Sequence, residues 1–277
     1  MAHDDDPHDD RAARFARMIE RETRAWLVDV SAASRLLTRV PPILRRRFGR
    51  AEGLATPGPI GRAVRAFPVV GAAIGLVAGL AYALLHAIGL PTAVAAIVAL
   101  AVGALLTGAL HEDGLADTAD GFGGQSREQK LALMHDSRIG AYGVLALLLA
   151  LGAKLGALAD LESIGLVLAG FVCSGATSRA MMSPLMRWLE PARPDGLGAS
   201  AGRPPVYAVL VGLALALVLS LILLSWPGLI AFLIAALGAY GMALLARGQI
   251  GGHTGDVLGA TQQVADLLFL LTLAAIR

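Results

Sequence analysis

From Phe67 to its end, the chain alternates long apolar runs with short polar islands. About 20 apolar residues suffice to cross the hydrocarbon core of a bilayer, which is about 30 Å thick. Such segments must be helical, because backbone N–H and C=O groups find no water to bind in lipid. The pattern therefore predicts an all-α fold, a polytopic membrane helical bundle. About seven transmembrane helices are expected, at residues 67–86, 91–110, 140–159, 163–185, 205–224, 227–246 and 257–276.

The residues before the first span follow a different pattern. Between positions 11 and 40, apolar residues recur mostly at three- and four-residue steps with arginines between them, which predicts an amphipathic helix. Either this helix is interfacial and lies along an anionic membrane surface, or it packs on the cytoplasmic face of the protein itself. Its apolar positions are Phe15, Met18, Ile19, Trp26, Val30, Ala33 and Leu37.

These patterns divide the chain into three parts. Residues 1–10 form an acidic tail that we expect to be disordered, and residues 11–66 form an N-terminal amphipathic, cytoplasmic segment. Residues 67–277 form the transmembrane domain, in which the candidate catalytic residues lie. The acidic start of the chain has no apolar core, so it is not a signal peptide.

Composition supports a membrane protein and excludes a large soluble one. Hydrophobic residues make up 56% of the chain and charged residues 16%, against roughly 45 to 50% and about 25% in soluble domains. The single cysteine, Cys173, excludes an internal disulfide framework.

The basic residues are distributed unevenly and predict the orientation. Residues 1–65 contain 13 of the 23 Lys and Arg, and most of the others lie in the islands 111–139, 186–204 and 247–256. The connections near 87–90, 160–162 and 225–226 contain neither residue type. By the positive-inside rule, the islands face the cytoplasm and the C-terminus lies outside.

The first island, HEDGLADTADGFGG (111–124), is acidic. If it is helical, Asp113, Asp117 and Asp120 follow an i, i+4, i+7 pattern and line one face. Three converging carboxylates repel one another unless a cation lies between them. Hard oxygen ligands suit Mg²⁺, which also takes ligands from substrate phosphates. The pattern thus predicts a Mg²⁺ site, and the alternative is a solvated acidic loop.

Later islands carry residues that complement an acidic, metal-binding face. Arg138 and Arg193 can neutralise phosphate oxygens, although each can also be a simple positive-inside anchor. His111 and His135 are both candidates for a general base, and the sequence does not choose between them. A glycine-rich stretch before the last span suits a bound phosphate at a helix start. The remaining candidates for phosphate binding are Asp136, Gly252, Thr254 and Asp256.

A few polar residues fall within the predicted spans. Asp266 is a functional candidate because intramembrane acids are costly, but a structural pair with Lys154 or Arg179 is an equal alternative. Cys173 and His86 are expected to be packing or interface residues.

Four stretches together resemble the motifs of one family. In chain order, HEDGLADTADGFGG (111–124), DSRIGAYG (136–143), PARPDGLG (191–198) and GGHTGDVLGATQQVAD (251–266) resemble those of the cobalamin synthases, also called adenosylcobinamide-GDP ribazoletransferases. LLTRVP (36–41) and FPVVGAAIG (67–75) look like the opening segments of that family. Two positions depart from its pattern: Asp266 stands where Glu is frequent, and Glu112 where an apolar residue is common.

The resemblance implies a Mg²⁺-dependent enzyme, multi-pass in the bacterial inner membrane, with its active site on the cytoplasmic side. Such enzymes join adenosylcobinamide-GDP to α-ribazole, or to its 5'-phosphate, and release GMP. The implied partners are these two substrates and the lipid bilayer. No nucleic acid is expected, and a homo-oligomer stays open.

Two other classes stay open on the residues alone. A CDP-alcohol phosphotransferase also uses an acidic helix in a membrane bundle, but its aspartates are more widely spaced. An aspartate-rich membrane prenyltransferase is a related enzyme class that these residues support less well. The non-enzyme alternative is an ion-coupled transporter or cation channel that uses Asp266 and Lys154. Against transport, the acidic cluster falls at the membrane boundary instead of the middle.

Overall fold

The computed structural model describes residues 7–39, 60–161, 163–194 and 202–276. Within them, regular structure is helical apart from an isolated bridge between Pro191 and His253. The predicted all-α fold is therefore confirmed. In chain order, the elements are α1 (Pro7–Leu37), α2 (Ile60–Ala63), the 3-10 turn η2 (Val64–Ala66), α3 (Phe67–Ala87), α4 (Thr92–Thr107), α5 (Leu110–Phe122), α6 (Arg127–Leu133), α7 (Ala141–Asp160), α8 (Ile164–Ala180), α9 (Met182–Trp188), α11 (Val206–Ile250) and α12 (Gly255–Ile276).

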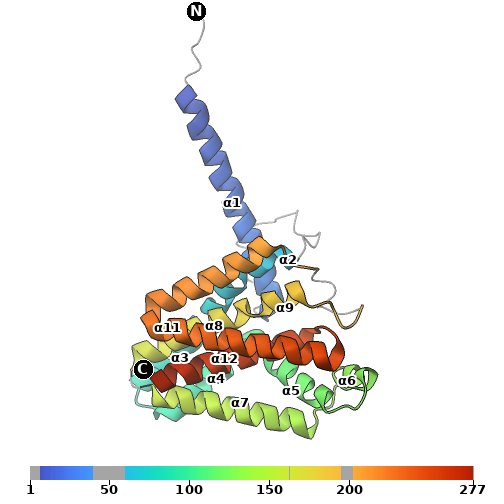
Figure 1. Ribbon diagram of the computed structural model, residues 1–277. Coiled ribbons are helices and arrows are strands. Elements are labelled where there is room, and N and C mark those ends of the chain that lie inside the picture. The colour runs from blue at the N-terminus through green and yellow to red at the C-terminus, as the bar shows by residue number, and fades with distance from the viewer. Residues whose placement is uncertain (1–6, 40–59, 162, 195–201, 277) are drawn as a thin grey trace, which may run out of the picture.

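Several of these helices are long and apolar enough to cross a membrane. Among the described residues there are five such segments, and a sixth if α4 and α5, which meet at 90°, count as one broken span. Figure 1 shows the long helices side by side in one bundle. A multi-pass arrangement is thus supported, while the number of about seven crossings stays a prediction. The five segments are Gly61–Ala87, Ala141–Asp160, Ile164–Trp188, Val206–Ile250 and Gly255–Ile276.

Helix α11 contains a reversal of the chain. A straight helix of its 45 residues would be about 68 Å long, roughly twice the hydrocarbon thickness. At Ser225 the backbone leaves the helical region, with φ 55° and ψ −137°. Figure 1 shows that the chain turns back there, and Gly228 lies so close to the Ser220 carbonyl that no side chain would fit. The two arms correspond to the predicted spans 205–224 and 227–246.

The predicted span 91–110 runs past the observed end of its helix. Helix α4 stops at Thr107, and Gly108 and Ala109 follow with φ of 66° and 56°. Two successive residues in this left-handed region cannot continue a right-handed helix. The backbone N–H of Arg39 donates to the Leu106 carbonyl at 2.8 Å, which satisfies one orphan group at this helix end. The acidic motif therefore begins immediately after a sharp elbow.

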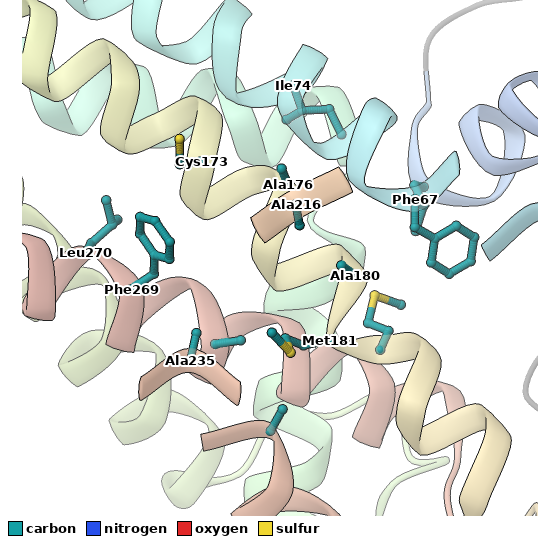
Figure 2. Packing of buried hydrophobic residues seen from close by; sticks show 14 of the residues in the cluster. Phe67, Ile74, Cys173, Ala176, Ala180, Met181, Ala216, Ala235, Phe269 and Leu270 are labelled. Carbon is teal, nitrogen blue, oxygen red and sulfur yellow. The ribbon is translucent and has the colours of Figure 1, made fainter. Parts of the chain in front are cut away.

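The core is built on close contacts between small residues. A side chain on Gly71 of α3 would collide with the Gly175 carbonyl of α8, so these two helices approach at backbone distance. Figure 2 shows part of the buried cluster, in which α3 contributes Phe67 and α12 contributes Phe269. Cys173 is completely buried in it, which confirms its role in packing.

The predicted N-terminal helix exists, and its C-terminal half packs on the protein. Ala33 and Leu37 are fully buried. Asp29, which is also buried, accepts hydrogen bonds from Arg62 Nε at 3.1 Å and Arg65 Nε at 2.7 Å. These ion pairs attach α1 to the segment just before α3.

The N-terminal half of α1 is different. It leads away from the bundle (Figure 1), and Phe15, Met18 and Ile19 are exposed. The helix begins at Pro7, so it includes the last residues of the predicted disordered tail, and residues 1–6 lie outside the described part. Contact of this half with lipid stays a prediction.

The polar islands meet at one end of the bundle. Helices α5, α6 and α9 lie at that end, and the C-terminus and the reversal in α11 lie at the other (Figure 1). This is the segregation that the distribution of arginine predicted. Which end faces the cytoplasm stays a prediction.

Candidate active site

Helix α5 is regular from Leu110 to Phe122, so Asp113, Asp117 and Asp120 follow one another along one side of it. Asp113 is exposed, and Asp117 and Asp120 are half-buried. The prediction that these three residues share one face of a helix is therefore confirmed. The buried side of α5 consists of His111, Gly114, Ala116, Thr118 and Gly121.

Glycines let α5 lie directly against the start of α12. A Cβ atom on Gly114 would lie 2.7 Å from the Asp256 carbonyl oxygen and 3.1 Å from the Gly259 Cα. Such distances are too short for a side chain, so glycine is needed here for close approach. The contact brings the aspartates of α5 beside Asp256, which lies about 140 residues further along the chain.

The carboxylates of this region influence one another. Partial burial, followed by the negative charges of Asp113, Asp256 and Asp120, raises the pKa of Asp117 to about 7, although Arg193 opposes the shift. Carboxylates that repel one another in this way favour a bound cation. We call Asp113, Asp117 and Asp256 the carboxylate cluster.

Two motifs far apart in the sequence are joined next to this cluster. The Ala192 N–H donates to the His253 carbonyl at 2.8 Å, and the His253 N–H donates to the Glu190 carbonyl at 2.9 Å. As a result, Arg193 Nη2 lies 3.0 Å from Asp256 Oδ2. The arginine that was predicted to bind phosphate is thus placed at the carboxylate cluster.

The loop before α12 supplies the other expected partners. Thr254 Oγ1 donates to Asp256 Oδ2 at 3.1 Å and accepts from the Val257 N–H at 3.2 Å, as the cap of a helix start does. Gly252 packs so tightly on the Glu190 carbonyl that a side chain would not fit. The structure therefore brings Gly252, Thr254, Asp256 and Arg193 together. Residues 195–198, which complete the motif PARPDGLG (191–198) that contains Arg193, lie outside the described residues.

Arg127 connects three islands through hydrogen bonds, and no motif or spacing in the sequence singles it out. Its Nε donates to the Ile250 carbonyl at 2.9 Å and its Nη2 to the Ala192 carbonyl at 2.7 Å. These partners are 123 and 65 positions away along the chain. No local spacing signals contacts over such separations, so only the folded structure reveals them.

Asp120 is placed differently from its two neighbours on α5. One carboxylate oxygen accepts from the Gly140 N–H at 2.7 Å and the other from the Gly143 N–H at 2.9 Å. It therefore caps the start of α7, where backbone N–H groups have no partners within the helix. A metal role for Asp120 stays a prediction, and both of its oxygens are already engaged.

Asp136 and Arg138 form a pair on the surface. Arg138 Nη2 lies 2.7 Å from Asp136 Oδ2, and the arginine side chain is 87% exposed. Hydrogen bonds from Arg138 lower the pKa of Asp136 to about 2. Both residues belong to the loop that leads into α7, and the described hydrogen bonds of their side chains are with each other. Their predicted role in binding phosphate is not tested by these contacts.

The two candidate bases differ in accessibility. His111 is 1% exposed, and burial lowers its pKa well below the ordinary value. Neither of its ring nitrogens has a hydrogen-bond partner among the described residues. His135 is exposed. A substrate hydroxyl could therefore reach His135 but not His111 in this conformation.

The described residues contain no ready-made metal site, in the sense of three or more His, Cys, Asp or Glu side chains gathered on one point. Mg²⁺ does not require one, since it usually binds one or two carboxylates and keeps water and substrate phosphates as its other ligands. The carboxylate cluster fits that mode of binding, because partial burial and, after it, the charges of the neighbouring carboxylates raise the pKa of Asp117, and a cation would relieve the repulsion among them. Magnesium itself stays a prediction.

Comparisons with known proteins agree with these motifs. A family model described as cobalamin-5-phosphate synthase matches residues 29–274. The chain belongs to this family. Its relatives include an adenosylcobinamide-GDP ribazoletransferase of Bradyrhizobium diazoefficiens, 46% identical over 225 residues, or 80% of this chain and 86% of that protein. Another, from Azorhizobium caulinodans, is 43% identical over 256 residues, or 88% of this chain and 94% of that protein.

Membership of the cobalamin-5-phosphate synthase family confirms the resemblance of the four motifs. It also decides among the classes of protein that the residues had left open. The matching family and relatives are transferases of cobalamin synthesis, and not CDP-alcohol phosphotransferases or transporters. No solved structure gives a significant match to the chain.

Proposed function

We propose that this protein is an adenosylcobinamide-GDP ribazoletransferase of the bacterial inner membrane, with its active site at the cytoplasmic end of the bundle. The observation that carries the proposal is the meeting of three motifs at one place. Helix α5 supplies Asp113 and Asp117, the segment after α9 supplies Arg193, and the start of α12 supplies Asp256. Relatives that bear the name of this enzyme support it.

The reaction is a transfer of a substituted phosphoryl group. The 3'-hydroxyl of α-ribazole, or of its 5'-phosphate, attacks the phosphorus next to the cobinamide. A new O–P bond forms, the bond from that phosphorus to the bridging oxygen breaks, and GMP leaves with the bridging oxygen. The hydroxyl proton passes to a base. The protein must mainly hold the two substrates in line and neutralise the diphosphate.

The residues at the site fit these tasks. One or two carboxylates of the cluster Asp113, Asp117 and Asp256 would hold Mg²⁺, which when bound neutralises and orients the diphosphate. Arg193 would contact the phosphate oxygens as a charge-assisted donor. Of the two histidines, His135 is the proposed base because a substrate can reach it.

A turnover assay on the purified protein in detergent tests this function. We expect GMP release that requires adenosylcobinamide-GDP, α-ribazole or its phosphate, and Mg²⁺. Asp113→Asn should lose most of the activity, whereas Glu128→Gln, a matched change of an exposed acid on α6, should retain it. GMP release that proceeds equally well without the ribazole substrate would refute the transfer reaction and indicate a hydrolase.

Labelling from each side of the membrane tests the location of the site. The natural cysteine, Cys173, is buried and should react little. Gln125→Cys, in the exposed turn after α5, should react with an impermeant reagent only when the cytoplasmic face is accessible. Labelling of this position from the periplasmic side alone would reverse the proposed orientation.

A further inference from the structure

A cavity of about 60 Å³ lies inside the bundle next to the N-terminal end of α5. Four charged residues from four helices line it: Glu112 of α5, Lys154 of α7, Arg179 of α8 and Asp266 of α12. Its remaining polar lining comes from Ser174, Gln262 and Gln263, and part of its wall is formed by small residues of α3 and α4. The proposed chemistry uses none of these side chains.

Hydrogen bonds connect α7, α12 and α5 along this cavity. Lys154 Nζ lies 2.6 Å from Asp266 Oδ2 and donates to Gln263 Oε1 at 2.7 Å. Gln263 Nε2 donates in turn to Glu112 Oε1 at 3.0 Å. Lys154 and Gln263 are almost completely buried. A substitution at any of these residues would therefore alter the hydrogen bond that holds the Glu112 carboxylate.

The network is incomplete at two charged residues that line the same cavity. Glu112 Oε2 and Arg179 Nε are buried and have no hydrogen-bond partner among the described residues. Arg179 is 6% exposed, and its Nη1 donates to the Gly175 carbonyl at 3.2 Å. Buried polar atoms without partners are costly, and a polar cavity of this size has room for a few water molecules that could bond to both atoms.

We propose that Glu112 and Arg179, joined through water in this cavity, are positioning residues for the carboxylate cluster. The inference rests on the proposed function, and it assigns to these two residues the support of side chains that bind the metal. Groups behind a metal ligand commonly fix its orientation, and their loss weakens metal binding.

The start of α5 needs such support. It follows the elbow at Gly108 and Ala109, and its N-cap residue makes no side-chain hydrogen bond. The position immediately after Glu112 is Asp113, on the exposed face of the same turn. A carboxylate held on the inner side of this turn therefore fixes the orientation of the carboxylate on its outer side.

The test compares Glu112→Gln with Glu128→Gln in the full-length protein. The first variant keeps the shape and the acceptor for Gln263 but removes the buried charge, whereas the second makes the same change on the exposed side of α6. Arg179→Gln removes the other charge. Two measurements are made on each: hydrogen exchange of the backbone amides of residues 110–116, and the Mg²⁺ concentration that gives half-maximal GMP release.

We expect faster exchange at the start of α5 and about a tenfold rise in half-saturating Mg²⁺ for Glu112→Gln and Arg179→Gln. Glu128→Gln should match the wild type in both, and Glu112→Asp should recover part of the Mg²⁺ effect. Unchanged exchange in both cavity variants would overturn the network, and faster exchange with unchanged Mg²⁺ dependence would overturn the positioning role. A wild-type protein without turnover would instead refute the proposed function, and the exchange comparison would still decide on the network.

Discussion

Replacing Asp120 by Asn should damage the protein in a different way from replacing Asp117. Both residues lie on the acidic face of α5, and from the sequence both were candidates for metal binding. In the structure, however, the two Asp120 oxygens accept from backbone N–H groups of Gly140 and Gly143 at 2.7 and 2.9 Å. Asp117 instead is partly buried among other carboxylates, and this burial, followed by their charges, raises its pKa.

The geometry sets the size of the expected effect. An asparagine at position 120 has one acceptor oxygen in place of two, so one hydrogen bond is lost and an amide N–H₂ faces a backbone N–H. A hydrogen bond to a charged group contributes about 1.5 to 3 kcal/mol. Loss of the negative charge at the start of α7 adds about 0.3 to 1 kcal/mol. We therefore expect a free energy of unfolding lower by about 2 to 4 kcal/mol.

Thermal unfolding in detergent and activity as a function of Mg²⁺ together test this assignment. Asp120→Asn should lower the unfolding midpoint by several degrees, and excess Mg²⁺ should not restore its activity. Asp117→Asn should keep a midpoint close to that of the wild type, and excess Mg²⁺ should restore part of its activity by mass action. If Asp120→Asn unfolds like the wild type and is rescued by Mg²⁺, then Asp120 is a metal ligand and the reasoning fails.

Three further outcomes follow from the site. Arg193→Ala should lower activity about ten- to a hundredfold without rescue by Mg²⁺, and Arg138→Ala should lower it less because its side chain is exposed; equal losses would contradict this. Gly114→Ala should force α5 from α12 and cost about 1 to 3 kcal/mol of stability, measured by unfolding. Because the pKa of Asp117 is about 7, half-saturating Mg²⁺ should rise as the pH falls from about 8 to 6; a flat profile would contradict this.

Local periodicity was enough to predict the helices and the face of α5 that carries the aspartates. The spacing of Asp113, Asp117 and Asp120 depends only on 3.6 residues per turn, which is a property of the backbone. The same spacing could not distinguish Asp120 from its neighbours. That distinction depends on where the start of α7 lies, and this is set by packing between helices.

The elbow before α5 and the contacts between islands were beyond prediction for related reasons. Gly108 is a residue type that often follows a helix end, but Ala109 adopts a left-handed conformation that its residue type does not favour, so the sequence does not signal the second residue of the elbow. Likewise, the approach of Arg193 to Asp256 depends on backbone hydrogen bonds between two loops. Residues of the right chemistry could be chosen from the sequence, but their partners could not.

The charged residues inside the bundle fit a supporting role better than ion transport. Lys154 and Asp266 lie 2.6 Å apart, so the acid that a transported cation would need is already neutralised. Asp266 lies within the continuous helix α12, whereas transport sites are typically built where a helix is broken, and the break at Gly108 and Ala109 comes directly before the acidic motif. The Lys154–Asp266 pair and the break at Gly108 and Ala109 instead lie next to the start of α5. Under the proposed function, the long helices would thus hold the carboxylate cluster in place at one end of the bundle.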